Sequence, residues 1–130
     1  MNKKTIFITG GASGLGKAIA LRYARAGYSV CIADINDERG EETLRELESM
    51  GADAIYLHCD VTREADLIAA KDTILQRWGT IGIVVNNAGV AVSGAIENQS
   101  LEDWEWIIGV NLMSVVMGCR IFTPQFKQQG

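Results

Sequence analysis

A glycine-rich turn is the part of this sequence best suited to bind a charged ligand. It reads Thr9-Gly10-Gly11-Ala12-Ser13-Gly14-Leu15-Gly16 and lies between an apolar run at residues 5–9 and a helix-forming run at residues 17–26. Glycines leave room where a side chain would block a phosphate, and the following helix offers free N–H groups and the positive end of its dipole. The spacing is neither GxGxxG nor the P-loop, which needs a Gly-Lys-Ser/Thr sequence. The turn therefore predicts a pyrophosphate site, with a ligand-free glycine connection as the alternative.

An acidic residue, Asp34, ends the next apolar run at residues 28–34. A carboxylate at a strand end can accept hydrogen bonds from the diol of an adenosine ribose, and its distance from the glycine turn, about 20 residues, is typical of such sites. A solvated strand-end acid is the alternative for Asp34 alone. A carboxylate repels a 2′-phosphate, and no arginine stands in the turn or directly after Asp34. Asp34 therefore favours NAD over NADP.

The elements that would position these residues alternate strictly between strand and helix. Strands are predicted at residues 5–9, 28–34, 54–59 and 81–85. Helices are predicted at residues 17–26, from a cap at Asn36 or Asp37 to Met50, from a cap at Thr62 to Trp78, and from Leu101 towards Phe126. Strands that are apolar along their whole length are typical of a parallel sheet covered on both faces. The fold class is therefore α/β, with residues 1–130 as one domain.

Composition excludes several classes of function. The chain has 130 residues, 48% of them hydrophobic, with 14 glycines and one proline, which is typical of an ordered globular domain rather than a disordered one. A net charge of −4 without a basic run speaks against nucleic acid as a partner. Three cysteines without a CxxC pair indicate reduced thiols and a cytoplasmic location. The apolar stretch after Lys3 and Lys4 is too short for a signal peptide, and no stretch reaches membrane-spanning length, so no membrane partner is expected.

Four motifs, in order along the chain, resemble those of the classical short-chain dehydrogenases/reductases. Thr9-Gly10-x-x-x-Gly14-x-Gly16 looks like the family's TGxxxGxG motif, and Asn86-Asn87-Ala88-Gly89 resembles its NNAG motif. Asp60-Val61 matches the pair that lies against adenine in that family. Asn111 stands where the family has the helix asparagine of its Asn-Ser-Tyr-Lys tetrad. Together the four matches cover essentially the whole chain, and jointly they are specific.

The resemblance implies an NAD(P)-dependent oxidoreductase acting on alcohols, sugars, steroids or keto compounds. It also implies a Rossmann-like, doubly wound, three-layer parallel sheet, here truncated after about four strands in the order 3-2-1-4. On that analogy the pyrophosphate meets Gly10, Ser13, Gly14, Leu15 and Gly16. Asp34 and Ile35 contact the adenosine ribose, Asp60 and Val61 flank the adenine, and Asn87, Ala88 and Gly89 meet the ribose on the nicotinamide side. Asn111 orders a water molecule in a proton relay.

The rest of the family's catalytic tetrad is missing from these residues. The family's chemistry needs a tyrosine with a lysine four residues on and a serine that binds the substrate oxygen. Tyr23, Tyr28 and Tyr56 all precede the NNAG motif, and none has a lysine four residues later. The only histidine, His58, is interpreted as a strand histidine with a satisfied hydrogen bond, and no metal-ligand cluster is present. We therefore expect this chain alone to be catalytically incompetent, with Asn111 its only tetrad member.

The sequence also allows other interpretations of function and assembly. The chain could be a non-catalytic NAD-binding module or assembly partner derived from such an enzyme. A phospho-receiver domain is disfavoured because the first strand ends in Thr9-Gly10 rather than in clustered acids. Truncation would leave the strand at residues 81–85 as an unprotected edge and would uncover the helix that carries Asn111, so a homo-oligomer through either surface is expected. Trp104 and Trp106 are interpreted as core or subunit contacts.

Overall fold

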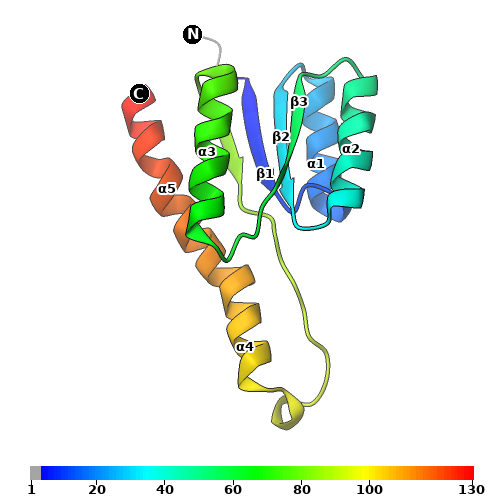
Figure 1. Ribbon diagram of the computed structural model, residues 1–130, viewed down its shortest axis with the longest axis vertical. Coiled ribbons are helices and arrows are strands. Elements are labelled where there is room, and N and C mark those ends of the chain that lie inside the picture. The colour runs from blue at the N-terminus through cyan, green and yellow to red at the C-terminus, as the bar shows by residue number, and fades with distance from the viewer. Residues whose placement is uncertain (1–3) are drawn as a thin grey trace.

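Four parallel strands form one sheet in the order β3-β2-β1-β4 in the computed structural model, which describes residues 4–130 (Figure 1). The strands are β1 (Thr5–Thr9), β2 (Ser29–Asp34), β3 (Ala54–His58) and β4 (Ile83–Val85). The helices are α1 (Gly14–Arg25), α2 (Asp37–Ser49), α3 (Glu64–Trp78), the short η1 (Ile96–Asn98), α4 (Leu101–Ile108), the π-helical η2 (Gly109–Met113) and α5 (Ser114–Gln129). The predicted α/β fold and strand order are confirmed. Residues 1–3 of the predicted domain lie outside the described residues.

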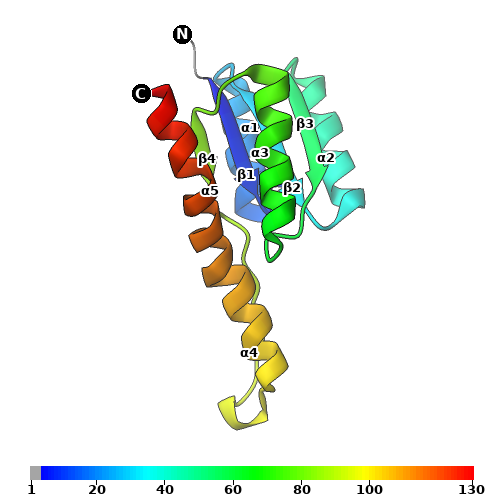
Figure 2. The same ribbon diagram turned by 60° about the vertical axis from the view of Figure 1, so that its left-hand side comes forward.

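The sheet is covered by helices on both faces. Helices α1 and α2 lie on one face, and α3 and α5 lie on the other (Figures 1 and 2). Each residue of strand β1 is buried, in keeping with its β-branched and aromatic sequence Thr-Ile-Phe-Ile-Thr. Because all four strands are parallel, their carboxyl ends lie at one edge of the sheet. Thr9, Asp34, His58 and Val85 therefore end their strands at the edge where ligands bind in open α/β sheets.

Two helix starts differ from the predictions. Helix α1 begins at Gly14, after an extended N-cap residue Ser13, so Gly14, Leu15 and Gly16 lie in its first turn rather than before the helix. Helix α3 begins after Arg63, and the predicted cap at Thr62 is wrong. The Thr62 hydroxyl instead donates to the Asp60 carboxylate at 2.6 Å.

Strand β4 begins at Ile83 and is therefore shorter than the predicted strand at residues 81–85. The side chain of Gln129, at the end of α5, accepts a hydrogen bond from the Ile81 N–H at 3.0 Å and donates to the Ile81 carbonyl at 2.8 Å. These contacts satisfy the backbone of Ile81 without a neighbouring strand. Gly82 remains tied to β1 through its N–H, which lies 3.1 Å from the Thr5 carbonyl oxygen.

Helices α4, η2 and α5 follow one another without a break and extend well beyond the sheet (Figures 1 and 2). A capping box at the start of α4 joins Ser100 and Asp103, as expected for a helix that begins at Leu101. The continuous segment Leu101–Gln129 has 29 residues and a window of mean hydropathy 1.5 that is 28% buried. It is long and apolar enough to cross a membrane by length and composition alone, so the expectation that no stretch reaches that length is wrong. Core helices of water-soluble proteins pass the same test.

Candidate functional site

A cavity of about 370 Å³ lies at the carboxyl edge of the sheet, between the glycine turn and helices α4 and η2, residues 101–113, which together are called the α4 arm. Nine of the residues predicted to meet a dinucleotide line it: Gly10, Ser13, Asp34, Ile35, Asp60, Val61, Asn87, Ala88 and Gly89. The other lining residues are Ala33, Cys59, Thr62, Val90, Trp106 and Val110. Gly14, Leu15, Gly16 and Asn111 stand outside the lining. Segments from the ends of all four strands thus converge on one hollow.

The glycine turn packs tightly against the loop after β4. Gly10 has φ +64°, and a Cβ atom there would lie 3.0 Å from the Cα of Ala88. A Cβ atom on Gly16 would collide with the carbonyl oxygen of Gly10 and stand 2.6 Å from Nδ2 of Asn87. Gly14, in contrast, has φ +56° and nothing within 4 Å of the same position. Two glycines therefore allow close packing, while the third faces open space at the N-terminus of α1.

Helix α1 presents unpaired N–H groups towards this open space. Within residues 4–130, no side chain caps the helix, and its first turn contains no acidic residue. The N-terminus of a 12-residue helix carries a partial positive charge that favours an anion. The local chemistry therefore suits a pyrophosphate.

Thr9 and Asn87 clamp the glycine turn to the end of β4. The Asn87 side-chain amide donates to the carbonyl oxygens of Thr9 and Gly10 at 3.1 and 3.2 Å. The Thr9 hydroxyl oxygen accepts from the N–H groups of Asn87 and Ala88 at 3.0 and 3.1 Å. The Asn87 amide nitrogen is thus committed to the backbone of the turn. Its structural task is to hold two sides of the cavity together.

The carboxylate of Asp34 is oriented by backbone N–H groups on either side of it. Its Oδ2 accepts from the Ala12 N–H at 3.2 Å, and its Oδ1 accepts from the Asn36 N–H at 3.1 Å. Ala12 is itself held by the hydroxyl of Thr43, which donates to its carbonyl oxygen at 3.0 Å. A carboxylate has about four acceptor positions, so these two bonds leave capacity for two donors from a ligand.

The loop after β3 supplies a second acid beside an apolar wall. Asp60 Oδ1 accepts from the Thr62 N–H and hydroxyl at 2.9 and 2.6 Å, and its own N–H donates to Asp66 Oδ2 at 2.9 Å. The hydrogen bond from the Thr62 side chain holds the pKa of Asp60 below its usual range, so this group stays ionised at neutral pH. Burial raises the pKa of the neighbouring Cys59 thiol to about 12, so it remains neutral. Val61 and the Cys59 thiol together offer a surface suited to a flat, uncharged ring.

The α4 arm contributes a wall that the sequence interpretation missed. Trp106, expected to be a core or subunit contact, lines the cavity together with Val110. These two residues are four apart and so share a helix face, which is the sequence signal that could have grouped them. The side chain of Trp106 remains 47% exposed, so its ring has room for a further contact.

Asn111 does not line the cavity itself but binds the backbone of Val90, which does. It lies in the π-helical segment Gly109–Met113, a geometry often found at functional sites. Its Oδ1 accepts from the Val90 N–H at 2.8 Å, and its Nδ2 donates to the Val90 carbonyl at 2.8 Å. Asn111 thereby fixes the loop after β4 where Val90 forms part of the wall.

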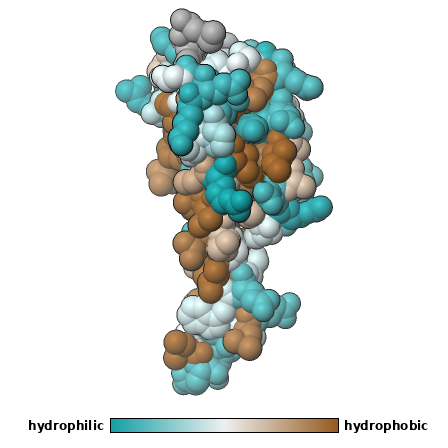
Figure 3. Space-filling view, turned by 90° about the vertical axis from the view of Figure 1, so that its left-hand side faces the viewer, coloured by the Kyte–Doolittle hydropathy of each residue, from teal (hydrophilic) through white to brown (hydrophobic). Residues whose placement is uncertain are grey.

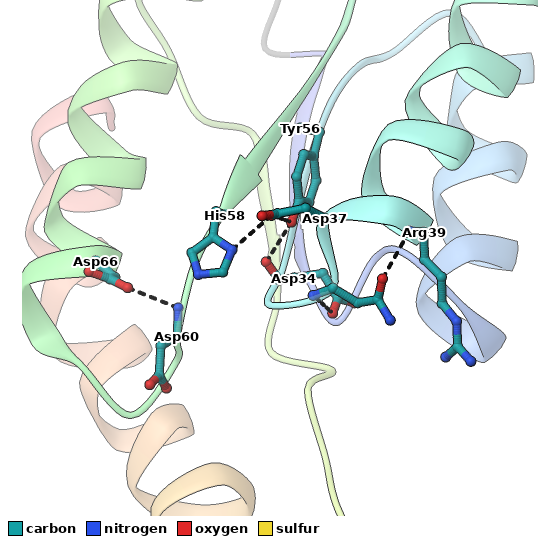
Figure 4. Close-up of polar contacts among 8 residues, drawn as sticks. Asp34, Asp37, Arg39, Tyr56, His58, Asp60 and Asp66 are labelled. Carbon is teal, nitrogen blue, oxygen red and sulfur yellow. Dashed lines mark hydrogen bonds and ion pairs between the residues drawn. The ribbon is translucent and has the colours of Figure 1, made fainter.

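His58 carries a satisfied hydrogen bond, as predicted, and it is exposed. Its Nδ1 lies 2.8 Å from Oδ1 of Asp37 (Figure 4). Among residues 4–130, no three histidine, cysteine or acidic side chains are grouped to hold a metal ion. The described residues at this edge offer hydrogen-bond acceptors, a helix N-terminus and apolar walls.

Comparison with known proteins shows which family the chain resembles. The sequence profile of the short chain dehydrogenase family matches residues 4–130. An uncharacterized oxidoreductase of Thermotoga maritima is 37% identical over 127 residues, which is 98% of this chain and 50% of that protein. Cyclopentanol dehydrogenase of Comamonas testosteroni is 37% identical over 128 residues, 98% of this chain and 51% of that protein.

Solved structures agree with the sequence relatives. A short chain dehydrogenase/reductase from Burkholderia phymatum, crystallised in complex with NAD, superposes with a TM-score of 0.92 at 35% identity over 96% of this chain and 46% of that chain. The chain spans about half the length of the curated relatives it matches. The chain therefore belongs to the short-chain dehydrogenase/reductase family.

Proposed function

We propose that residues 1–130 form the NAD-binding part of an oxidoreductase that transfers a hydride between NAD and an alcohol or carbonyl substrate. The observation that carries the proposal is the pairing, in one cavity, of the glycine turn with the Asp34 carboxylate, which is oriented by the N–H groups of Ala12 and Asn36. The complex of the Burkholderia phymatum relative with NAD supports the same cofactor class.

The cavity and the helix start beside it suit different parts of the dinucleotide. The open space at Gly14 and the uncapped start of α1 suit the pyrophosphate, with Gly10, Ser13, Leu15 and Gly16 around it. Asp34 and Ile35 would hold the adenosine ribose, and Asp60 and Val61 would flank the adenine. Asn87, Ala88 and Gly89 would meet the ribose on the nicotinamide side. When bound, NAD supplies the hydride acceptor.

Asn111 is the one member of the family's catalytic tetrad that this sequence carries. We assign it the task of ordering a water molecule in the proton relay, supported by its fixed contact with Val90. A serine and a YxxxK pair at the family's positions are absent from the 130 residues. Residues 1–130 are therefore proposed to bind NAD without turning over substrate.

A non-catalytic NAD-binding module derived from such an enzyme is the second candidate. Mixing the chain with NAD and a panel of secondary alcohols, while NADH absorbance is followed, tests whether it is incompetent as proposed. NADH formation would overturn this part of the proposal, because it would require a proton donor other than the family's tyrosine.

Removing the Asp34 carboxylate tests the cofactor choice. Titration calorimetry should show heat with NAD, and Asp34→Ala should weaken NAD about tenfold while weakening NADP less, because the lost hydrogen bonds go to a ribose diol that NADP lacks. Asp72→Ala, which removes an exposed acid on α3, is the matched control and should bind as wild type. Equal losses for both cofactors would contradict the preference for NAD. A wild-type chain that gives no heat with either NAD or NADH would overturn the function itself.

Self-association is a further part of the proposal. Strand β4 ends the sheet order, and the α4–α5 segment carries exposed apolar side chains, seen as brown surface in Figure 3. The large hydrophobic side chains of this segment that are exposed are Leu101, Trp104, Trp106, Ile108, Leu112, Met113 and Val116. Apolar patches of this kind are seldom left uncovered, and a second copy of the chain is the proposed cover. Sedimentation should therefore show a dimer or larger species whose population rises with concentration, and a clean monomer at high concentration would contradict it.

A cytoplasmic location is also part of the proposal, and the cysteines support it. Cys31, Cys59 and Cys119 are all free thiols. Free thiols persist in a reducing compartment, so we assign the protein to the cytoplasm.

A further inference from the structure

The position of the Asp34 carboxylate depends on where two segments meet. Its two oxygen atoms are held by N–H groups of the glycine turn and of the chain leading into α2. Asn36 also caps α2, because its Oδ1 accepts from the Arg39 N–H at 3.0 Å. A shift of the start of α2 relative to the end of β2 would therefore move the carboxylate.

Tyr56 bridges the same two segments from the neighbouring strand (Figure 4). It pairs with Ile32 in the β2–β3 register, two residue pairs before Asp34 and His58. Its hydroxyl lies 2.8 Å from the backbone carbonyl oxygen of Asp34 and 2.6 Å from Oδ1 of Asp37, so its single proton is shared between the two acceptors. The end of β2 and the first residue of α2 are thus joined through one phenol.

The ring of Tyr56 is built into this junction. A Cβ atom on residue 40 of α2 would collide with the Tyr56 ring, and Gly40 stands there instead. The ring therefore lies directly against the helix backbone, and its hydroxyl reaches the first turn. Such contact fixes the ring even without the hydroxyl.

Asp37 is a dependable acceptor for the phenol. His58 Nδ1 lies 2.8 Å from the same carboxylate oxygen. The hydrogen bonds from Tyr56 and then His58 hold the pKa of Asp37 below its usual range, and desolvation and then Asp37 raise the pKa of Tyr56. Near neutral pH the acid is ionised and the phenol keeps its proton, which is the arrangement that the bridge requires.

We propose that Tyr56 is a positioning residue for cofactor choice, whose hydroxyl ties Asp34 to Asp37 and so holds the Asp34 carboxylate where it accepts from the ribose diol and rejects a 2′-phosphate. This inference rests on the proposed NAD site. Because Asp34 distinguishes the two cofactors, loosening it alters the ratio of their affinities. A residue that only stabilised the fold would leave that ratio unchanged.

Tyr56→Phe is the sharpest test, because it keeps the ring against Gly40 and removes only the hydroxyl. Titration calorimetry on the chain should show NAD weakened about tenfold, the scale of one lost hydrogen bond, and NADP weakened less or not at all. Tyr28→Phe is the matched control at the far end of β2, where its ring packs edge-on against Tyr23 at 4.9 Å. It should leave both affinities as in wild type.

Variants at Asp37 test whether Tyr56 acts through its hydrogen bond to the first residue of α2. Asp37→Ala should reproduce the change in the NAD-to-NADP affinity ratio, and Asp37→Asn, which keeps an acceptor oxygen, should restore most of it. Combining Asp37→Ala with Tyr56→Phe should add little to either change, because both remove the same bridge. If Tyr56→Phe does not fold, Asp37→Ala at the exposed end of the bridge carries the test alone.

The outcomes separate this inference from the function on which it rests. Wild-type chain that binds neither cofactor removes the NAD site and the inference together. Wild-type binding of NAD with an unchanged affinity ratio in both Tyr56→Phe and Asp37→Ala overturns the inference alone. A lower melting temperature with the ratio unchanged assigns Tyr56 a purely structural role and also overturns it.

Discussion

Gly16→Ala is expected to weaken NAD binding about 100-fold, equivalent to about 2.7 kcal/mol, and to lower the free energy of unfolding by about 2 kcal/mol. An added Cβ atom would collide with the Gly10 carbonyl oxygen and stand 2.6 Å from Nδ2 of Asn87. The first contact is with backbone, so the turn itself would have to shift. The second displaces the amide that holds Thr9 and Gly10. Both the glycine turn and the loop after β4 would therefore leave the geometry that suits a pyrophosphate.

Gly27→Ala is the matched control for this prediction. Gly27 has φ +86° just after α1, and nothing lies within 4 Å of the position of an added Cβ atom. Alanine there strains the backbone by about 1 kcal/mol without touching the cavity. Calorimetry should show wild-type NAD affinity for Gly27→Ala and a large loss for Gly16→Ala. Wild-type affinity in Gly16→Ala would show that the close packing of Gly16 on Asn87 has no part in binding.

The elements that local chemistry determines could be predicted from the sequence. Strand β1 is a continuous apolar run, and parallel strands covered on both faces need no polar alternation. Gly27 and Gly79 have φ of +86° and +74° directly after α1 and α3, which is why they signal the ends of those helices. Asp34 was predicted at a strand end and lies there, lining the cavity.

Features that depend on distant partners could not be predicted. The shortening of β4 follows from Gln129, which binds the backbone of Ile81 from a position 48 residues later. Threonine is a common N-cap residue, but the Thr62 hydroxyl donates a hydrogen bond to Asp60. The residue before the helix is Arg63 instead. In each case a tertiary contact outweighs a local preference.

The candidate site also contains residues that could be predicted from local chemistry and residues that depend on distant contacts. The glycine turn and Asp34 are recognisable because each carries its chemistry in its residue type and spacing. Trp106 is not, because an aromatic residue on an amphipathic helix has the same sequence pattern whether it faces a core, a subunit or a cavity. Its place in the cavity is set by how the α4 arm leaves the sheet. The role of Tyr56 could not be predicted for a similar reason. Its hydroxyl contacts Asp34 and Asp37 only because of the β2–β3 register and because Gly40 has no side chain.

Phe122→Ala is expected to lower the free energy of unfolding by about 3–5 kcal/mol, the cost of a large cavity in a packed core. Phe122 is 2% exposed on α5, and its ring centroid lies 5.3 Å from that of Phe7 in the central strand. This pair holds α5 against the sheet, and α5 continues into the arm that carries Trp106 and Val110. A loss of this size is a large share of the total stability of a domain, about 5–15 kcal/mol. The wall of the cavity should loosen with it, so NAD affinity should fall as well.

Val116→Ala on the same helix is the control, because Val116 is 40% exposed and its truncation should change stability by no more than about 0.5 kcal/mol. Urea unfolding followed by circular dichroism measures the first effect, and calorimetry with NAD measures the second. If Phe122→Ala destabilises the chain but binds NAD as wild type, the α4 arm is dispensable for the cofactor, and the adenosine half of the site is formed by the sheet edge alone. If Phe122→Ala costs no more stability than Val116→Ala, α5 is not held by the Phe7–Phe122 contact, and this account of how the arm is positioned is wrong.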